Sequence, residues 1–485
     1  MGRQPDYQHK FFITNFNLEK RVRSNHPLRK IRDKIDFDFI YDEVKDSYGL
    51  NGNVSVPPPI ILKMMLLLVL YNVRSERELV DTIPERIDWL WFLDFDLDDD
   101  IPNHSVLSKA RIRWGVEAFK RFFEIVLWQC VEEDLVDGSK LFIDSSLIDA
   151  DASNNSVVDT KRLKKHLNKS YKHLEERLDD LMENKTTPAN KRFISATDPD
   201  ASVISYGKNK PKLRYKTHRT VDEKHEVITS TKVTTGSVDD GKVLDEMIDL
   251  VEQNTQKKID TVVADTKYGT TDNFLICHDK EIKAHIPSIE ESHRGSGRRK
   301  GIFSKEKFTY DPDTDTFTCP AGKVLTKQKF KKKRKHYEYI ASSKACRECH
   351  IRDKCTRSKS GRTLKRHARQ DELEAIVKKT KSRKSKKDLK TRQHLSERSF
   401  ARSTRYGFKR SRWRRLWRME IQDFLIATIQ NILVLIDQPK QRMSKSNVKE
   451  CRKVGIQSLK RQGYGPHNWL MSFISILFLS LVPNE

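Results

Sequence analysis

Two aspartates in the middle of the chain each follow an apolar run of the kind that forms a buried strand. Asp144 comes directly after Leu-Phe-Ile at 141–143, and Asp265 comes directly after Val-Val-Ala at 262–264. A carboxylate in such a place is costly to desolvate unless a positive charge lies against it. If the two strands are neighbours, the pair is a natural site for Mg²⁺, which prefers carboxylate oxygens and keeps waters for substrate phosphates. The alternative is that each aspartate only caps a turn.

A third carboxylate would complete a two-metal site, in which one ion activates the attacking oxygen and the other steadies the leaving oxygen of a phosphodiester. The best candidate is Glu397, because it lies on a predicted helix that is followed at once by the basic run RYGFKRSRWRRLWR at 405–418. Glu420 is the competitor. It stands in an apolar-periodic helix, and we expect it to make a surface or interhelix contact instead.

Four of the seven cysteines, Cys319, Cys346, Cys349 and Cys355, form a C-x26-C-x2-C-x5-C pattern among basic residues. Four thiolates suit tetrahedral Zn²⁺, which would hold together a small subdomain that has little core of its own. The same spacing could hold an iron–sulfur cluster, or the thiols could be free. The odd number of cysteines and the lack of an apolar segment at the start argue against a secreted disulfide scaffold.

The elements that would position the aspartates are strands rich in β-branched residues and bounded by polar or glycine turns. They are KLFIDSSLIDA at 140–150, RYKTHRTVD at 214–222, HEVITSTKVTT at 225–235 and DTVVADTKYG at 260–269. A helix at 243–251 joins the third and fourth strands. Apolar residues recur at helical spacing from 421 to 436, which predicts a long packed helix.

The region from about 37 to 134 has a helical pattern. Ser75 and Glu78 have the spacing of a capping box, and a single helix is expected from Ser105 through Val126. Basic side chains on this helix would suit docking on DNA, and a plain helical bundle is an equal alternative. The side chains concerned are Arg111, Arg113, Lys120 and Arg121.

The charge of the chain is concentrated in one segment. The 485 residues carry a net charge of +26, and the segment 323–418 alone holds 36 Lys and Arg against 8 Asp and Glu. The rest of the chain is therefore close to neutral. Aromatic residues and cysteines are interleaved with these cations, which favours a folded surface that tracks phosphates and stacks on bases over a solubilising stretch.

Several segments, taken in order, resemble insertion-sequence transposases of the DDE class, which have an RNase H-like core. The resemblance covers 37–436. It is carried by PPPIILKMMLLLVLYNVRSERELVDTI and IPNHSVLSKAR near the start; by FIDSSLIDADAS, DPDAS, YKTHRTVD and VVADTKYG in the core; and by ERSFARSTRYGFKRSRWRRLWRMEIQDFLIATIQNI at the end.

The resemblance implies a triad of Asp144, Asp265 and Glu397 that holds two Mg²⁺ or Mn²⁺ ions for DNA cleavage and strand transfer. It also implies that His218 and Tyr268 support the site. Family members commonly carry an Arg and a Lys at the places of Gln393 and Thr404, and here Arg392 and Arg405 stand one step away. DNA-binding residues are expected to be Arg392, Arg405, Lys409, Arg410, Arg412, Arg414 and Arg415.

The expected fold is α/β: an RNase H-like mixed sheet flanked by helices, with an all-α N-terminal domain and a basic, cysteine-containing insertion. The expected order is a basic arm (1–34), a helical DNA-binding domain (35–136), the first part of the catalytic core (137–290) with a helical insertion at 157–190, a basic four-cysteine insertion with structural zinc (291–391), core helices with the final glutamate (392–440) and a tail of unknown role (441–485).

The predicted function is that of a DNA transposase. Its expected partners are double-stranded DNA, as terminal inverted repeats and as target, and a second copy in a homodimer. No membrane is expected, because the apolar runs at 60–73 and 469–482 are shorter than the roughly 20 residues of a spanning helix. The expected location is cytoplasmic, with the nucleoid. Two alternatives are a non-catalytic DNA-binding protein derived from a transposase and a metal-dependent nuclease with an iron–sulfur subdomain.

Overall fold

The computed structural model describes residues 17–48, 55–159, 190, 192–205, 210–292, 300–358 and 360–438. Two of the predicted features fall outside the described residues. They are the helical insertion, apart from residues 157–159 and 190, and the tail from 441 onward.

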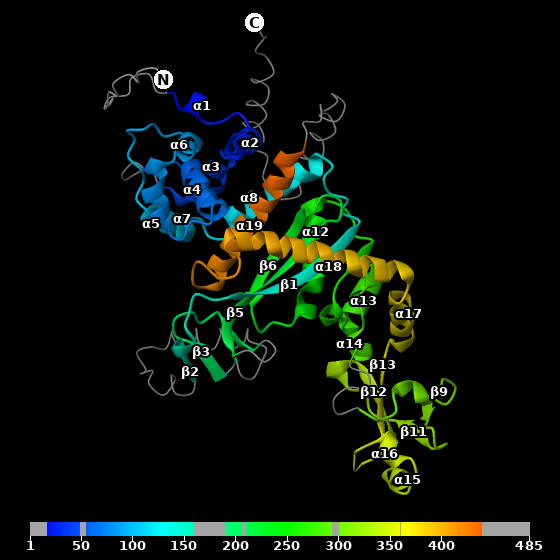
Figure 1. Ribbon diagram of the computed structural model, residues 1–485. Coiled ribbons are helices and arrows are strands. Elements are labelled where there is room, and N and C mark those ends of the chain that lie inside the picture. The colour runs from blue at the N-terminus through cyan, green and yellow to red at the C-terminus, as the bar shows by residue number, and fades with distance from the viewer. Residues whose placement is uncertain are drawn as a thin grey trace, which may run out of the picture. The chain divides into compact units, whose positions relative to one another are not determined.

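Eight α-helices of the described chain precede the first strand (Figure 1). They are α1 (Leu18–Arg21), α2 (Pro27–Lys34), α3 (Phe39–Val44), α4 (Pro58–Leu70), α5 (Glu76–Thr82), α6 (Ile87–Leu93), α7 (Ser105–Trp114) and α8 (Glu117–Glu132). Helix α4 is apolar on every side and almost wholly buried, so it forms the centre of this group. Ser75 caps α5 by accepting a hydrogen bond from the Glu78 backbone, as the sequence pattern predicts.

Two predictions for this region are wrong. Residues 17–34, expected to be part of a basic arm, include α1 and α2, and Leu28 and Ile31 of α2 are buried in the main hydrophobic core. The helix expected to run from Ser105 through Val126 is two helices, because Gly115 ends α7 with a φ of 64° and a ψ of −159°. Any residue other than glycine is strained in that backbone conformation, so the turn there depends on Gly115.

The central sheet has the strand order β4-β5-β1-β7-β8, and β6 also pairs with β5. Its strands are β1 (Lys140–Asp149), β4 (Ser202–Ile204), β5 (Lys212–Val221), β6 (Ile228–Thr235), β7 (Thr261–Val263) and β8 (Lys283–His285). Strands β5, β1 and β6 are antiparallel neighbours, whereas β1, β7 and β8 run parallel. This mixed sheet confirms the predicted α/β, RNase H-like fold class. A separate ribbon pairs β2 (Val157–Asp159) with β3 (Phe193–Ser195).

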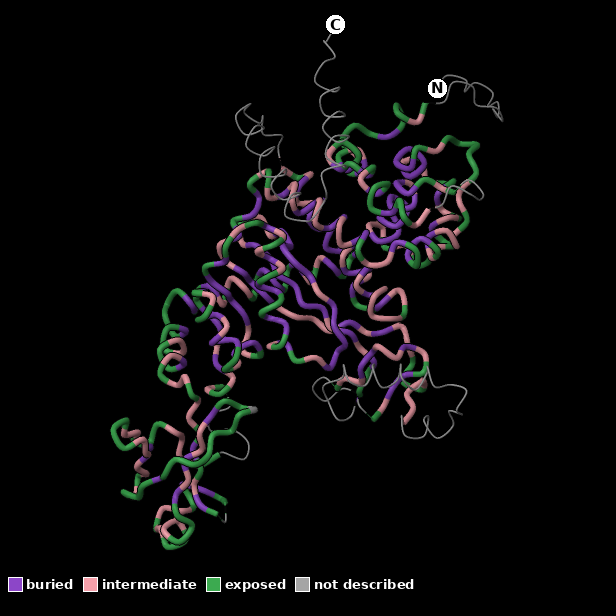
Figure 2. Tube along the Cα trace, turned by 180° about the vertical axis from the view of Figure 1, so that it is seen from behind, coloured by how far each residue is buried: buried purple, intermediate pink, exposed green. Residues whose placement is uncertain are grey.

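Successive residues of β1 pack into two different hydrophobic cores, because successive side chains of a strand point to opposite faces of the sheet. Leu141 and Ile143 pack with α12 (Leu244–Thr255) and α13 (Thr271–Asp279). Phe142 belongs to the other core, which also contains the N-terminal helices and α19 (Leu416–Asp437). Helix α18 (Arg383–Ser403) packs against β1, β7 and β8, and the strands lie buried between the helices (Figure 2).

The insertion is a small antiparallel sheet in the order β13-β12-β11-β10-β9. Its elements are β9 (Thr309–Asp311), β10 (Thr316–Thr318), β11 (Val324–Lys327), β12 (His336–Ala341), α15 (Ser343–Arg347), α16 (Arg352–Cys355) and β13 (Thr363–His367). It has a core of its own around Phe317, Leu325 and Tyr339. Helices α14 (Ile289–Ser292) and α17 (Gln370–Thr380) lie on either side of it in the sequence.

Helix α19 confirms the long apolar helix predicted near the end of the core. By length and composition it could cross a membrane, but 72% of its most apolar window is buried within the protein. Its apolar side chains therefore have partners in the main hydrophobic core, among them Phe123 of α8, whose ring lies 5.8 Å from that of Phe424.

Candidate active site

The structure places Asp144 and Asp265 side by side. Strands β1 and β7 run parallel with Phe142 opposite Val263, and each aspartate comes two residues after its member of that pair. Because side chains alternate along a strand, both carboxylates leave the sheet on the face of Phe142 and Val263. Backbone groups hold both side chains: the Ser145 N–H donates to Asp144 Oδ1 at 2.8 Å, and the Lys267 N–H donates to Asp265 Oδ1 at 3.0 Å.

The two carboxylates repel each other. Burial raises the pKa of Asp265, and the charge of Asp144 raises it further, whereas Lys267 and Arg392 act in the opposite direction. The ammonium of Lys267 is also attracted to Asp240, at 3.4 Å from Oδ2. The two carboxylates are therefore held close together beside the sheet, and Lys267 and Arg392 lie near them and act against their repulsion.

Arg392 is the cation in direct contact with the pair. Its Nη1 donates to Asp144 Oδ2 at 2.6 Å, and its side chain is only 13% exposed. Helix α18 brings it there because one face of the helix is anchored to the sheet along its length. On that face, one turn before Arg392, the carboxylate of Asp388 is 2.7 Å from His285 Nδ1 on β8. Arg392 was predicted to bind DNA, and in this structure its guanidinium is instead directed into the site.

Glu397 lies on the same helix but is exposed. It accepts a hydrogen bond from Gln393 Nε2 at 3.0 Å. Five residues correspond to about 140° around a helix axis, so Glu397 and Arg392 do not point the same way. Among the described residues, the structure records no contact between Glu397 and either aspartate. Two residues of the predicted triad, Asp144 and Asp265, therefore lie together, and Glu397 does not join them.

His218 and Tyr268, predicted as supporting residues, meet behind the aspartates. His218 Nδ1 lies 3.3 Å from the Tyr268 hydroxyl, and Nε2 lies 3.0 Å from Thr234 Oγ1. Both side chains are buried. Burial lowers the pKa of His218 to about 4, so the ring is neutral near pH 7. Burial and then the charges of Asp240, Asp144 and Asp265 raise the pKa of Tyr268, which therefore stays protonated.

Sequence reasoning missed Asp240, which is 2% exposed and completes this polar cluster. Lys216 Nζ lies 2.9 Å from Asp240 Oδ1, and His218 Nδ1 lies 3.9 Å from the same oxygen. Burial acts to raise the pKa of Asp240, but Lys216 and Lys267 outweigh it, and the net shift is downward. Nothing in the polar segment GSVDDGK at 236–242 distinguishes this aspartate from a solvated turn residue.

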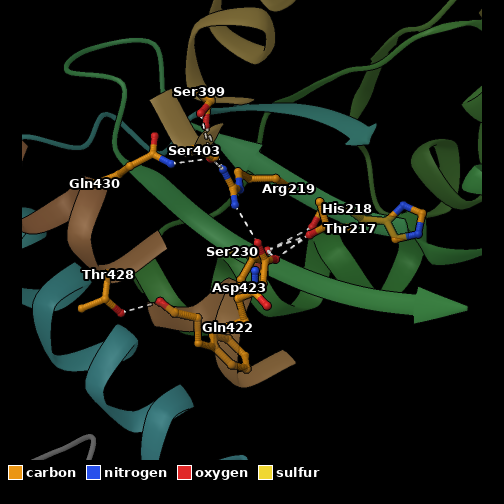
Figure 3. A network of polar contacts seen from close by, with 12 residues as sticks. Thr217, His218, Arg219, Ser230, Ser399, Ser403, Gln422, Asp423, Thr428 and Gln430 are labelled. Atoms are coloured by element: carbon orange, nitrogen blue, oxygen red, sulfur yellow. Dashed lines mark hydrogen bonds and ion pairs between the residues drawn. The ribbon is translucent and has the colours of Figure 1, made fainter. Parts of the chain in front are cut away.

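A buried ion pair fixes α18 and α19 to the sheet (Figure 3). Arg219 of β5 donates to Asp423 Oδ1 of α19 at 2.7 Å and to Ser403 Oγ of α18 at 2.7 Å. Thr217 and Thr231 donate to the other oxygen of Asp423. Arg219 and Asp423 are both inaccessible to solvent, so each needs the other to remain charged. This network sets the position of the helix that carries Arg392 and Glu397.

The other predicted DNA-binding residues follow α18 and differ in what they contact. Arg405 and Lys409 are exposed. Arg410 and Arg414 pair with Asp151, at 2.8 and 3.4 Å. Arg412 instead donates to the Val73 carbonyl at 2.5 Å and to the Asn72 side chain, so it joins this loop to the N-terminal helices. Arg415 has a φ of 87°, and its backbone N–H donates to Asp198 Oδ1 at 3.1 Å.

Arg111, predicted to lie on a basic face of the N-terminal helices, is also buried. It pairs with Glu76 and stacks on the Trp413 ring, with 4.0 Å between the guanidinium carbon and the ring centroid. Its charge is therefore paired inside the protein and is not exposed for contact with a binding partner.

The four cysteines all belong to the insertion, with Cys319 directly after β10, Cys346 on α15, Cys349 between the two short helices and Cys355 on α16. Burial raises the pKa of Cys355, Arg362 lowers it, and the charges of Cys319, Cys346 and Cys349 raise it further. Among the described residues, their sulfurs do not form a group of three or more ligand atoms within 4.8 Å of one another, so the structure does not hold them as a preformed metal site. The Lys323 N–H donates to Cys319 Sγ at 3.3 Å. A backbone donor of this kind stabilises a thiolate, and four such ligands suit Zn²⁺.

Among the described residues, the ligand atoms of His278, Asp279 and Glu372 lie within 4.8 Å of one another. The guanidinium of Arg369 already bridges the two carboxylates, with distances of 2.8 Å to Asp279 and 2.9 Å to Glu372. Its hydrogen bonds lower the pKa of Asp279 to about 2. We interpret this group as a set of ion pairs that connects α13 to α17.

Glu420, the competitor for the third carboxylate, lines a cavity of about 360 Å³ between α8, β6, α12 and α19. Lys232, Glu117 and Glu246 line the same cavity. Burial, offset by Lys232, raises the pKa of Glu420 to about 7. The structure records no contact of Glu420 with Asp144 or Asp265 among the described residues, so it is not part of the candidate site.

A mixed sheet in which two parallel strands end in paired aspartates defines an RNase H-like core of the class that acts on phosphodiesters. Two family models match the chain. Residues 16–113 match a transposase domain (DUF772), and residues 318–436, which include the four cysteines and Glu397, match a transposase DDE domain. These matches confirm the predicted resemblance to DDE transposases and the predicted function of a DNA transposase.

Among solved structures, a cryo-EM structure of the piggyBac transposase synaptic complex with hairpin DNA matches at 10% identity over 95% of this chain and 84% of that chain, with a TM-score of 0.31. At this TM-score the overall likeness of the two structures is weak. A comparison with curated proteins gave no match.

Proposed function

We propose that the protein cleaves DNA at the ends of a mobile element and joins the cleaved end to target DNA, with Asp144, Asp265 and Glu397 as the catalytic carboxylates. The observation that best supports this proposal is the pairing of Asp144 with Asp265 at the carboxyl ends of two adjacent parallel strands. Water attacks the phosphodiester first and releases a 3′-hydroxyl. That hydroxyl then attacks the target phosphodiester, so each step forms one P–O bond and breaks one.

The donor set fits divalent cations, because two half-buried carboxylates that repel each other are stabilised by a cation between them. Asp144, Asp265 and Glu397 would hold two Mg²⁺ or Mn²⁺ ions, which when bound activate the attacking oxygen and stabilise the leaving oxygen. Lys267 and Arg392 hold positive charge beside the carboxylates. Glu397 is exposed and contacts neither aspartate among the described residues, so its place in this set rests on the sequence resemblance.

The basic segment would supply the DNA contacts. Arg405 and Lys409 directly follow α18 and are exposed, so phosphates bound there would lie close in sequence to the final carboxylate. The partners in this proposal are element ends, target DNA and a second copy of the chain, and the location is the nucleoid in the cytoplasm. Zinc on the four cysteines would stabilise the insertion, and an iron–sulfur cluster is the alternative that a visible absorbance of the purified protein would support.

The test is Mg²⁺-dependent cleavage of the DNA that flanks the coding region on each side. Asp144→Asn and Asp265→Asn should each lower the cleavage rate by at least about a hundredfold and leave binding of the same DNA, measured by fluorescence anisotropy, within about twofold. Asp149→Asn is the matched control, because Asp149 lies on the same strand and pairs with Lys212 at 2.7 Å instead. Cleavage by Asp144→Asn at the wild-type rate would contradict the assignment.

A second candidate is a non-catalytic DNA-binding protein derived from a transposase. The contact between Arg392 and Asp144 favours it, since a guanidinium can neutralise that carboxylate without any metal ion. This candidate predicts DNA binding that weakens with salt but no Mg²⁺-dependent nicking of either flanking sequence, by the wild type or by any variant.

A further inference from the structure

Strands β11 and β12 of the insertion sheet and the turn between them, residues 324–341, are here called the basic hairpin. It continues as a ladder beyond the two strands: the Gln328 N–H donates to the Glu338 carbonyl at 2.7 Å, and the Lys331 N–H donates to the His336 carbonyl at 2.9 Å. A short 3-10 turn, Lys332–Arg334, closes the tip. The backbone of the tip is therefore held in a regular turn by hydrogen bonds.

The tip carries positive charge that the protein does not neutralise. Lys329, Lys332, Arg334 and Lys335 are exposed, and within the described chain none of the four has an acidic partner at ion-pair distance. Lys331 has a distant partner, with 3.9 Å between Nζ and Glu338. Arg111 and Arg412, by contrast, pair or hydrogen-bond with other parts of the protein. Unpaired cations close together on one turn attract a polyanion.

An aromatic side chain lies in the middle of this charge. Phe330 is 38% exposed, and among the described residues it is the one phenylalanine in the exposed class. Its ring packs on Tyr337 at 4.9 Å between centroids and 48° between planes. Tyr337 in turn packs against the core of the insertion and has Lys327 Nζ 3.9 Å from its centroid. Phe330 thus has a fixed support behind it and part of its ring open to solvent.

We infer that the basic hairpin binds unpaired bases of DNA, with one base stacking on Phe330 and the adjoining phosphates on Lys329, Lys332 and Arg334. The inference rests on the proposed DNA substrate and adds which form of DNA this surface takes. Both faces of a base inside a duplex are covered by its neighbours, so an exposed ring reaches only a base that is unpaired or at an end. Stacking on an aromatic ring beside cations is how proteins bind single strands without reading sequence.

The test compares two DNAs with the full-length protein at one salt concentration and without added Mg²⁺. One is a blunt duplex, and the other is the same duplex with a short single-stranded extension that contains 2-aminopurine, whose fluorescence is quenched by stacking. The wild type should bind the extended DNA more tightly. Phe330→Ala should weaken binding of the extended DNA about tenfold, leave blunt-duplex binding unchanged, and lose the change in 2-aminopurine fluorescence.

Two variants make the result specific. Phe330→Trp keeps a stacking ring and should retain both the preference and the fluorescence change. Val324→Ala removes another exposed apolar side chain of the same hairpin, 52% exposed, and should behave as the wild type. Equal loss by Phe330→Ala on both DNAs would overturn the inference in favour of duplex binding. No loss on either DNA would overturn it in favour of a purely structural role for the Phe330–Tyr337 pair.

The outcome can be separated from that of the proposed function. Asp144→Asn should lose cleavage and keep the preference for extended DNA, because Asp144 is not part of the hairpin. If the wild type cleaves nothing, the binding comparison still decides the role of Phe330. If cleavage is found and the preference is absent, the proposed function stands and the inference about the hairpin fails.

Discussion

Arg392 is the residue whose contact has the most direct consequence for the chemistry. Its guanidinium donates a hydrogen bond to Asp144 Oδ2, and a divalent cation would compete for the same carboxylate. Arg392→Gln should therefore bind Mn²⁺ more tightly than the wild type, by about tenfold for the loss of one partly solvated charge contact. Isothermal titration calorimetry of the protein without DNA measures this directly. Arg398→Gln is the control, because Arg398 is on the same helix and pairs with Glu226 at 2.6 Å.

Two outcomes would count against this prediction. One is equal Mn²⁺ affinity of the wild type and Arg392→Gln, which would mean that the guanidinium does not compete with the ion. The other is tighter binding that persists when Asp144→Asn is added, since the ion would then be bound elsewhere.

Glu420 predicts a pH dependence of stability at the residue scale. A glutamate in the unfolded chain titrates near 4.5, whereas burial raises the pKa of Glu420 to about 7 in the folded protein. The folded state therefore prefers the protonated form, and the stabilisation is complete below pH 4.5 and is lost as the pH rises through 7. Glu420→Gln imitates the protonated form and should be free of this loss.

The stability difference between Glu420→Gln and the wild type should accordingly grow with pH, from near zero in acid to at most about 3 kcal/mol in alkali. Denaturant unfolding at several pH values gives this difference. Glu117→Gln is the control, because Glu117 lines the same cavity but its side chain is 82% exposed. A difference that stays constant with pH would mean that the pKa of Glu420 is the same in the folded and the unfolded protein.

At the scale of elements, the sequence predicted those parts of the fold that depend on local pattern. Runs of β-branched residues identified β1, β5, β6 and β7, and helical spacing of apolar residues identified α12 and α19. The break at Gly115 was missed because the apolar pattern continues across it. The first two helices were missed because α2 has only two buried residues in a basic segment.

Part of the candidate site could likewise be predicted from the sequence, and part could not. The pairing of Asp144 with Asp265 could be predicted, because two strand ends in one parallel pair must meet. The rotation of α18 could not, because it depends on contacts between residues far apart in the chain. Arg219 and Asp423 are 204 residues apart, and Arg392 and Asp144 are 248 apart. No local pattern indicates which charged side chains such contacts will bury, and they decide that Arg392 and not Glu397 lies against Asp144.

For the whole molecule, the separate cores predict how the protein responds to loss of a metal ion. The insertion has its own small core, which shares no residue with the two cores of the rest of the chain. Zinc on Cys319, Cys346, Cys349 and Cys355 would stabilise that core alone. Metal analysis should find one zinc ion per chain, and a strong chelator should make the insertion sensitive to limited proteolysis while the sheet that carries Asp144 stays resistant.

The chelated protein should also bind DNA more weakly, because the basic hairpin belongs to the part that loosens. Cys349→Ser should reproduce both effects without a chelator, whereas Cys277→Ser changes a cysteine buried among residues of another core and should keep its zinc. Proteolysis that begins in the central sheet after chelation would contradict the independence of the insertion. A protein without zinc whose insertion is fully resistant to protease would show that the four thiols need no metal, because the packing of Phe317, Leu325 and Tyr339 then suffices to hold the subdomain together.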